Sequence, residues 1–315
     1  MKRSEAPAFM SVTTFCAALA VGVSVSLCST ACSSGKSETS SSLHASSSEM
    51  VIRITGSDTM VNLVQAWAEN YKQRRPDVSV QVAGGGSGVG IAGLSEGILD
   101  IAAAGREMKA DEMTRAQAHN GTQPQEFTVA LDALAVYVDK DNPLDSISVE
   151  ELAEIYGEWG QIQKWSQLGI TNSACKSDDI IRVSRQNSSG TYAYFREVVL
   201  GDKREYKLGS IDQSGSKDVV ALVSRTPCAI GYSGMAFAVI GVKALKVSKK
   251  KGGPMVSPTA EAAINGSYPI TRRLYLYTRG EPTGQTKIFL DWVLGIDGQK
   301  IVRDVGFVPV LVAGT

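Results

Sequence analysis

The chain has 315 residues, of which 43% are hydrophobic and 20% are charged. This composition is typical of a globular protein with buried cores, and the length is sufficient for two domains. Because 32 Lys and Arg balance 32 Asp and Glu, the formal net charge of zero argues against a nucleic-acid binder that works through bulk positive charge. A small anion is still a suitable ligand, since local dipoles can attract it.

The N-terminal segment has the pattern of an export signal. Two basic residues precede an apolar run that ends near Leu27, and small residues follow. We expect a signal peptide over residues 1–31 and, because Ser-Thr-Ala-Cys resembles a bacterial lipobox, lipidation of Cys32. Ser29 stands where a lipobox usually has leucine, so plain secretion and an uncleaved membrane anchor stay open as alternatives. Residues 32–49 are rich in serine and are predicted to form a flexible tether.

Two cysteines remain in the part that is expected to fold. After export, Cys175 and Cys228 would lie in an oxidising compartment. A disulfide bond and a pair of buried thiols are equally compatible with the sequence, because spacing alone does not give the separation of the two residues. No Cys/His spacing indicates a metal site, and we expect no cofactor.

The folded part is predicted to begin near Met50 and to alternate strands, loops and helices, a pattern typical of an α/β fold with a parallel sheet. Expected strands cover residues 51–55, 78–84, 98–106, 127–144, 179–185, 228–238 and 268–280. Helices are expected over residues 60–76, 110–121, 191–201, 216–227 and 284–295, with a further helix that follows Gly90 and runs through Leu94 and Gly97.

The long apolar strand over residues 127–144 predicts that the chain passes from one lobe to another. We therefore expect a discontinuous first lobe, residues 50–131 and 233–315, and a second lobe over residues 132–232. Two crossings of this kind would produce a cleft between the lobes with a hinge at its base.

Three loops between a strand and a helix carry small polar residues. They read GSDT at 56–59, GGGSG at 84–88 and RQNSSGT at 185–191. A single loop of this kind is more simply explained as a capped turn. However, ligands of open α/β sheets bind beyond the carboxyl ends of the strands. Three helix N-termini that converge there would surround a tetrahedral oxyanion with neutral donors.

Three charged residues near these loops are candidates for contact with the anion. Arg185 and Arg106 can each match two oxyanion oxygens, although a surface arginine or a structural ion pair explains either residue at least as well. Asp58 would repel an anion unless it accepts a hydrogen bond from a protonated oxygen, which would favour hydrogen phosphate over sulfate. The alternative is that Asp58 caps the following helix.

The chain resembles the PstS family, the phosphate-binding components of bacterial ABC uptake transporters. The resemblance lies in GSDTMVNLVQAWAENY, VQVAGGGSGVGIAGL, VSRQNSSGTYAYFRE, RTPCAIGYSG and FLDWVLGIDGQKIVRDVGFVPV, which together span almost all of residues 51–310. It implies an α/β, two-lobed periplasmic-binding-protein fold of type II, in which each lobe is a mainly parallel sheet flanked by helices. By motif position, the implied ligands of phosphate in the interlobe cleft are Thr59, Ser87, Arg185, Ser189, Gly190 and Thr191; the first loop adds Ser57 and Asp58.

The resemblance also implies a function. The protein would bind inorganic phosphate outside the cytoplasm and deliver it to the permease of an ABC transporter. It would be a non-enzymatic, lipid-anchored receptor, periplasmic or at the cell surface, monomeric and without nucleic-acid contacts. One position departs from the family, because Gly105 stands where family members carry an Asp that accepts the phosphate proton. Either Asp58 takes this role or Arg106 adds charge instead.

Other functions stay open on the sequence alone. The same fold could bind sulfate or molybdate, or act as a phosphate sensor. Gly88, Gly90 and Gly93 match the GxGxxG pattern of dinucleotide-binding enzymes, with Glu107 following, but the pattern is offset into the expected helix. A serine hydrolase is disfavoured, because the sequence has no Gly-x-Ser-x-Gly elbow and no histidine near a candidate nucleophile.

Overall fold

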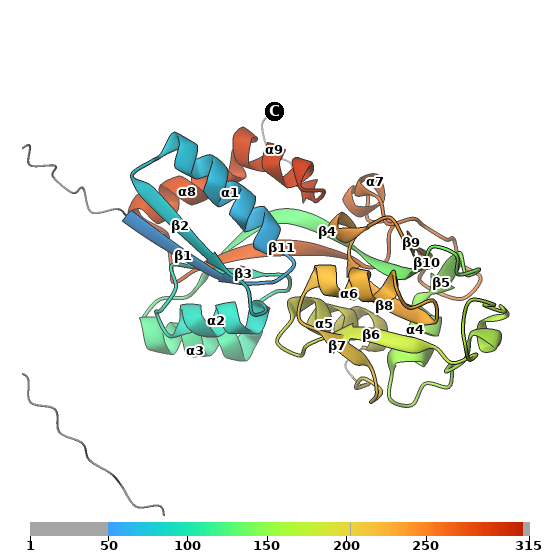
Figure 1. Cartoon of the computed structure of the whole chain (residues 1–315). Helices are drawn as coiled ribbons and strands as arrows, with labels where there is room; N and C mark the ends of the chain where they lie inside the picture. Colours follow the sequence, from blue (N-terminus) through green and yellow to red (C-terminus); the bar gives the residue numbers. More distant parts are fainter. Residues whose placement is uncertain (1–49, 202, 311–315) are drawn as a thin grey trace, which may run out of the picture. The chain divides into compact units, whose positions relative to one another are not determined.

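The computed structural model describes residues 50–201 and 203–310, so the predicted signal peptide, tether and Cys32 lie outside the described residues. The described residues belong to one compact unit of the chain. Its strands form a mixed sheet in the order β2-β1-β3-β11-β4-β8-β6-β7, with helices on its faces (Figure 1). Within the described ranges, the helices are too short or too polar to cross a bilayer.

The expected strands and helices of the sequence analysis are found, and several short strands are added. The strands are β1 (Met50–Gly56), β2 (Val78–Ala83), β3 (Ile101–Ala104), β4 (Gln125–Asp139), β5 (Ser146–Ser148), β6 (Ile181–Arg185), β7 (Ile211–Gln213), β8 (Ala229–Gly234), β9 (Val242–Ala244), β10 (Lys246–Ser248), β11 (Thr271–Thr278) and β12 (Val308–Pro309). The α-helices are α1 (Val61–Arg74), α2 (Ser87–Ser95), α3 (Ala110–Asn120), α4 (Val149–Tyr156), α5 (Gly190–Phe195), α6 (Ser216–Val223), α7 (Ala260–Ile264), α8 (Gly284–Leu294) and α9 (Ile296–Asp304). Single turns are η1 (Trp165–Leu168), η2 (Arg196–Leu200) and η3 (Met235–Phe237).

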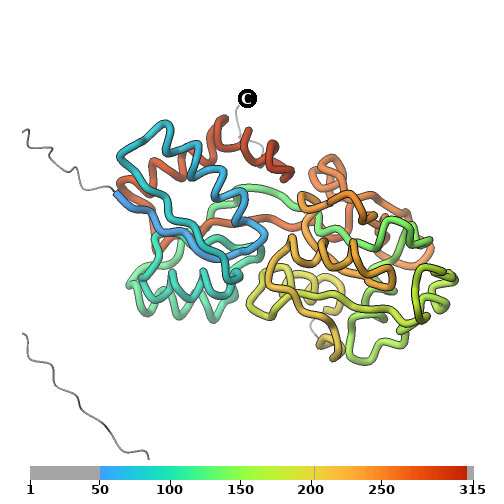
Figure 2. The backbone as a smooth tube through the Cα atoms, in the orientation of Figure 1, coloured from blue at the N-terminus to red at the C-terminus, as the bar shows by residue number. Residues whose placement is uncertain are grey.

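Strand β4 takes part in two halves of the sheet. Up to Ala133 it pairs with β11 and β12, and from Leu134 onward it pairs with β8 and β9. We call the strands β1, β2, β3, β11 and β12 the first half and the strands β6, β7, β8 and β9 the second half. Figure 2 traces β4, in green, and β11, in orange-red, as they run side by side.

The outer strands of each half are parallel, as the alternation of strands and helices predicts. Strand β1 pairs in parallel with β2 and β3, and β6 does so with β7 and β8. Strands β4 and β11 join them in the antiparallel sense. The lobe boundaries stay a prediction, and the pairing of β9 with β4 and of β10 with β5 favours a second crossing nearer to Thr271 than to residue 233.

In the first half, neighbouring strand residues contact helices on opposite faces, as the two-residue period of a strand requires. Ile101 and Leu274 belong to a core that includes residues of α1, α8 and α9. The adjacent Ala102 and Tyr275 pack instead with Ile91 of α2. Because helices cover both faces (Figure 1), the strands read as nearly continuous apolar runs.

The second half is covered in the same way. Val183 of β6 lies in the core with residues of α6, whereas Tyr232 of β8 packs on the other face with Tyr156 of α4 and Phe195 of α5. The loop after η1 is joined to the residue before β8 by the disulfide bond Cys175–Cys228, whose Cα atoms are 5.2 Å apart. Packing on both faces of this half therefore fixes the carboxyl end of β6, where Arg185 lies.

Candidate functional site

The three polar loops predicted from the sequence meet in the structure. The hydroxyl oxygens of Thr59, in the first loop, and Thr191, in the third, are 3.0 Å apart. A Cβ atom at Gly86, in the second loop, would lie 2.5 Å from the carbonyl oxygen of Ser188, in the third. The side chains of Thr59, Ser87 and Thr191 are 0–1% exposed. Together with Ser216 of α6, which lies 3.1 Å from Thr59, the loops form one buried group of hydroxyls, which we call the hydroxyl cluster: Ser57, Thr59, Ser87, Ser189, Thr191 and Ser216.

The first loop is set by a close approach of two strands. Gly56 ends β1 with φ +144°, and a Cβ atom there would lie 2.1 Å from the carbonyl oxygen of Ala103. Only glycine permits this contact and this backbone conformation. The next amide, that of Ser57, donates to the same carbonyl at 2.8 Å. The loop is therefore fixed against β3, and Ser57 is buried.

The second and third loops meet at the first residues of two helices. Ser87 begins α2 and Gly190 begins α5. A Cβ atom at Gly190 would lie only 2.3 Å from the Oγ of Ser87, so the contact requires glycine. The same Oγ accepts a hydrogen bond from the backbone N–H of Gly105 at 3.0 Å. Ser189 is the N-cap of α5, and its Oγ accepts from the N–H of Thr191 at 3.1 Å.

Arg185 brings a buried cation to the cluster. It ends β6, is 0% exposed, and donates from Nη1 to the Oγ of Ser216 at 2.9 Å. Its Nη2 donates to the carbonyl oxygen of Ser214 at 2.7 Å and lies 3.5 Å from Oδ2 of Asp58. Burial lowers the pKa of Arg185 to about 10, so the guanidinium is still protonated at neutral pH.

Asp58 ties the first loop to the second and does not cap α1. Its Oδ1 accepts from the backbone N–H of Gly85 at 2.8 Å, and its Oδ2 faces Arg185. The N-cap of α1 is Met60, which makes no side-chain capping bond. The alternative assignment of Asp58 as a helix cap was therefore wrong. Both carboxylate oxygens already have protein donors, so this geometry does not support Asp58 as acceptor of a ligand proton.

Arg106, proposed from the sequence as a second charge partner, does not reach the cluster. Its Nη1 and Nη2 each donate to Glu112 of α3 at 2.7 Å, and both side chains are about one-tenth exposed. Although burial acts to raise it, hydrogen bonds from Arg106 and from the backbone of Lys109 hold the pKa of Glu112 below its usual value. The structural ion pair, weighed as an alternative, is what the structure contains.

We expect Arg106→Gln to change the affinity for a bound anion by less than about twofold, the range of substitutions that lie outside a site. The same variant should lower the free energy of unfolding by roughly 1–3 kcal/mol, because it removes hydrogen bonds to a charged and largely buried carboxylate. Titration calorimetry and urea unfolding measure the two effects. A large loss of affinity with unchanged stability would place Arg106 at the anion after all.

Sequence analysis missed three residues that border or complete the cluster. Arg272 of β11 donates from Nη1 to the Oγ1 of Thr191 at 2.9 Å. Its Nε and Nη2 donate to Oδ2 of Asp132, in β4, at 3.0 and 2.8 Å. Burial raises the pKa of Asp132, and the charge of Arg272 opposes that rise. Ser216, the first residue of α6, lies 3.1 Å from Thr59 Oγ1. The signal available for two of them was a charged residue inside a largely apolar strand, Asp132 in β4 and Arg272 in β11.

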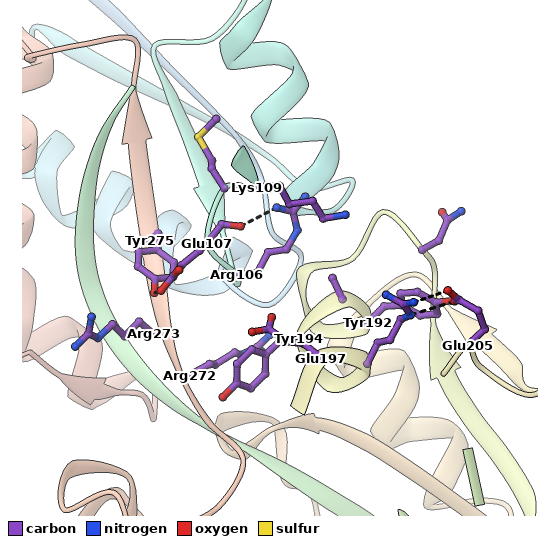
Figure 3. Close-up of a pocket in the computed structure, with 14 residues that line it drawn as sticks. Arg106, Glu107, Lys109, Tyr192, Tyr194, Glu197, Glu205, Arg272, Arg273 and Tyr275 are labelled. Atoms are coloured by element: carbon purple, nitrogen blue, oxygen red, sulfur yellow. Dashed lines mark hydrogen bonds and ion pairs between the residues drawn. The ribbon is translucent and has the colours of Figure 1, made fainter. Parts of the chain in front are cut away.

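A pocket of about 550 Å³ lies beside the cluster, lined by residues from the β3–α3 loop, α5, η2 and β11. Arg106 and Lys109 line one side and Tyr192 and Tyr194 the other (Figure 3). Arg272, which donates to Thr191 of the hydroxyl cluster, also lines this pocket. The cluster itself is buried.

The cluster is made of donors rather than of metal ligands or catalytic groups. Between residues 50 and 310, residue 202 aside, no group of three His, Cys, Asp or Glu residues could hold a metal ion. His119, the one histidine in the described part of the chain, is in the last turn of α3 and has no contact with the cluster. Hydroxyls, backbone N–H groups and guanidinium groups in a buried site suit a small oxyanion.

Comparison with known proteins agrees with this chemistry. A family model described as a PBP superfamily domain matches residues 33–295. The chain is 34% identical to the phosphate-binding protein PstS of Pseudomonas aeruginosa over 264 residues, 81% of each chain. It is 35% identical to the phosphate-binding protein PstS of Bacillus subtilis, over 90% of this chain and 88% of that one.

Solved structures give the same result. A phosphate ABC transporter substrate-binding protein from Clostridium perfringens, with bound phosphate, superposes with a TM-score of 0.73 at 29% identity, covering 83% of this chain and all of that one. An ABC-type phosphate transport receptor from Vibrio cholerae superposes with a TM-score of 0.66 at 26% identity, covering 82% of this chain and all of that one. The chain therefore belongs to the PBP superfamily and, within it, to the PstS family of phosphate-binding proteins.

Proposed function

We propose that the protein binds inorganic phosphate in the hydroxyl cluster and presents it to the membrane permease of an ABC transporter. The observation that carries this proposal is the meeting of the three polar loops around Arg185. The hydroxyl oxygen of Thr59 lies 3.0 Å from that of Thr191 and 3.1 Å from that of Ser216, and Arg185 donates to Ser216 at 2.9 Å. The names of the similar proteins, which are phosphate-binding proteins, support the choice of ligand.

The residues that we assign to phosphate have distinct tasks. The guanidinium of Arg185 supplies charge, and the hydroxyls of Ser57, Thr59, Ser87 and Thr191 can rotate to donate toward an oxyanion. Because Gly190 has no side chain, the third loop can pack against Ser87 without a steric clash. Ser189 caps α5 and so orders the backbone of this loop. All seven are buried, and a buried site strengthens each charge-assisted hydrogen bond.

Ligand entry requires movement, because the cluster is buried. The first and second loops follow strands of the first half, whereas the third follows β6 of the second half. An anion that contacts all three loops would stabilise the arrangement in which they meet. We propose opening between the halves as the route of entry and anion-driven closure as the capture step.

The proposed export and lipid anchoring depend on the N-terminal sequence, and the absence of catalysis depends on the side chains of the cluster. Residues 1–31 resemble a signal peptide, and Cys32 is a candidate for lipidation. We propose that the protein is exported and anchored outside the cytoplasm, acts as a monomer, and changes no covalent bond of its ligand. The cluster contains no base paired with a nucleophile, which supports binding rather than catalysis. The relatives found do not favour sulfate, molybdate or a dinucleotide as ligand.

Titration calorimetry tests the function directly. A chain that begins at residue 33 is freed of bound ligand by reversible unfolding and is then titrated at pH 7 with phosphate, arsenate, sulfate and molybdate. We expect tight one-to-one phosphate binding and weaker binding of the other anions. If sulfate or molybdate bound most tightly, phosphate would not be the ligand. If none of the four anions bound, the proposed transport function would be wrong.

A further inference from the structure

Gly105 leaves a place that a guanidinium fills. A Cβ atom at Gly105 would lie 3.1 Å from Nη1 of Arg272 and 3.3 Å from the Oγ of Ser57. The missing side chain would therefore point between a buried cation and a hydroxyl of the cluster. The carbonyl oxygen of Gly105 also accepts from Nη1 of Arg272, at 3.2 Å. A carboxylate side chain at this position would stand against Arg272, and glycine leaves the guanidinium facing the cluster.

The guanidinium of Arg272 has one edge on a carboxylate and the other on the cluster. Nε and Nη2 donate to Oδ2 of Asp132, which is 0% exposed. Nη1 donates to the Oγ1 of Thr191 at 2.9 Å, and Nη2 lies 3.4 Å from the Oγ1 of Thr59. Arg272 itself is 3% exposed. Asp132 thus fixes the orientation in which the guanidinium of Arg272 contacts the two hydroxyls.

A second guanidinium, that of Arg185, contacts a neighbouring hydroxyl of the cluster. Arg185 donates to Ser216 Oγ, which lies 3.1 Å from Thr59 Oγ1. The two nearby carboxylates have their oxygens on other donors: those of Asp132 on Arg272 and the N–H of Met235, and those of Asp58 on Arg185 and the N–H of Gly85. Among the described residues, no carboxylate accepts a hydrogen bond from a hydroxyl of the cluster.

We propose that Arg272 is a second guanidinium ligand of the anion, and that the two arginines select the doubly charged form of phosphate. This inference rests on the phosphate site proposed above. The carboxylates that balance these two cations have their oxygens on other donors. The site therefore offers guanidinium and hydroxyl donors but no carboxylate acceptor, which disfavours the singly charged form, because that form carries two protons that need acceptors. The one O–H group of hydrogen phosphate can donate a hydrogen bond to a hydroxyl of the cluster, because a hydroxyl accepts as well as donates. No carboxylate is needed as acceptor.

The charge preference predicts proton release. Near pH 6 most free phosphate carries one negative charge, so binding of the doubly charged form releases a proton to the buffer. Near pH 8 most phosphate is already doubly charged, and no proton is released. Arg185, whose pKa burial lowers to about 10, stays protonated in this range, and Tyr194 and Tyr232, whose pKa values burial raises to about 12, stay neutral. Burial raises the pKa of Asp132, and the charge of Arg272 and its two hydrogen bonds oppose that rise. The other charged groups that face the cluster are Asp58, Asp218 and Arg272.

The test is calorimetry with phosphate near pH 6 and pH 8, each in two buffers of different ionisation enthalpy, which gives the number of protons released. We expect release of about one proton near pH 6, almost none near pH 8, and affinity that rises with pH. Arg272→Gln should lose roughly ten- to hundredfold in affinity and most of the proton release. Arg273→Gln, the next residue on β11 and exposed, is the matched control and should keep both.

Failure of this inference can be told apart from failure of the function. Phosphate binding without proton release, together with unchanged binding by Arg272→Gln, would overturn the role of Arg272 and leave the phosphate receptor intact. No binding of phosphate by the unmodified chain at either pH would overturn both. Because Arg272→Gln leaves Asp132 unpaired, the double variant Asp132→Asn/Arg272→Gln is measured beside it. Circular dichroism checks its folding, and the same losses are expected.

Discussion

Gly190→Ala should lower the affinity for phosphate by about a hundredfold or more, because it displaces a ligand and separates two loops. The added Cβ atom would lie 2.3 Å from the Oγ of Ser87 and 3.0 Å from its Cβ, so Ser87 and the loop that carries it must shift. That shift also strains the hydrogen bond from the N–H of Gly105 to Ser87 Oγ. A hydrogen bond to a charged group contributes about 1.5–3 kcal/mol. The loss of two such bonds to phosphate, one from the second loop and one from the third, accounts for the expected effect. Titration calorimetry measures it.

The matched control is Gly88→Ala, one residue beyond Ser87 in α2. A Cβ atom at Gly88 would lie 3.5 Å from the carbonyl oxygen of Ser188, an ordinary contact, and the residue has no positive φ. Alanine also favours the helix, by up to about 1 kcal/mol. Affinity within about twofold of the unmodified chain is expected. Equal phosphate affinities for the Gly190 and Gly88 variants would remove the contact between Ser87 and Gly190 from the site.

The site could be predicted in outline from local sequence. The three loops stand out because small polar residues and glycines interrupt apolar strands directly before helices. The positions of Thr59, Ser87 and Thr191 depend mainly on where their own strand ends, and a strand end can be located from a few residues. The first two loops meet because β1 pairs with β2, and the third belongs to the other half of the sheet, which β4 joins to the first.

Arg272 and Asp132 could not be placed in the same way. They are 140 residues apart, yet they are directly opposite one another in the antiparallel pairing of β11 with β4. The sequence predicts both strands but not their register, and register decides which side chains face each other. Arg106 shows the opposite error. Its place after β3 favoured the site, but the first turn of α3 supplies Glu112 as a nearer partner.

The strands missed in the sequence are short. β5, β7, β9 and β10 have three residues each. A run of three residues carries too little alternation to be distinguished from a loop. These strands form because the fold brings a partner strand beside them: β7 pairs with β6, β9 with β4, and β5 with β10. Strand β9, for example, pairs with the end of β4. Tertiary context rather than local preference sets these strands.

We expect Asp132→Ala to lower the free energy of unfolding by about 3–5 kcal/mol, the range for removal of one partner from a buried ion pair. Asp132 is 0% exposed and accepts two hydrogen bonds from Arg272 and one from the N–H of Met235. Without it, a buried guanidinium has no counter-charge at the point where β4 changes partners. Urea unfolding followed by circular dichroism measures the change. Asp291→Ala, which removes an exposed pair with Lys287, should cost at most about 1 kcal/mol.

The double variant Asp132→Leu/Arg272→Met separates stability from binding. Replacing both charges by apolar side chains removes the unpaired cation, and such replacements of buried pairs are often neutral or stabilising. We therefore expect the double variant to unfold at nearly the urea concentration of the unmodified chain, while its phosphate affinity stays as low as that of Arg272→Gln. If the pair served only the fold, the double variant would recover phosphate binding together with stability. Recovery of stability alone would mean that the ion pair is kept in β4 and β11 because it holds a cation at the anion.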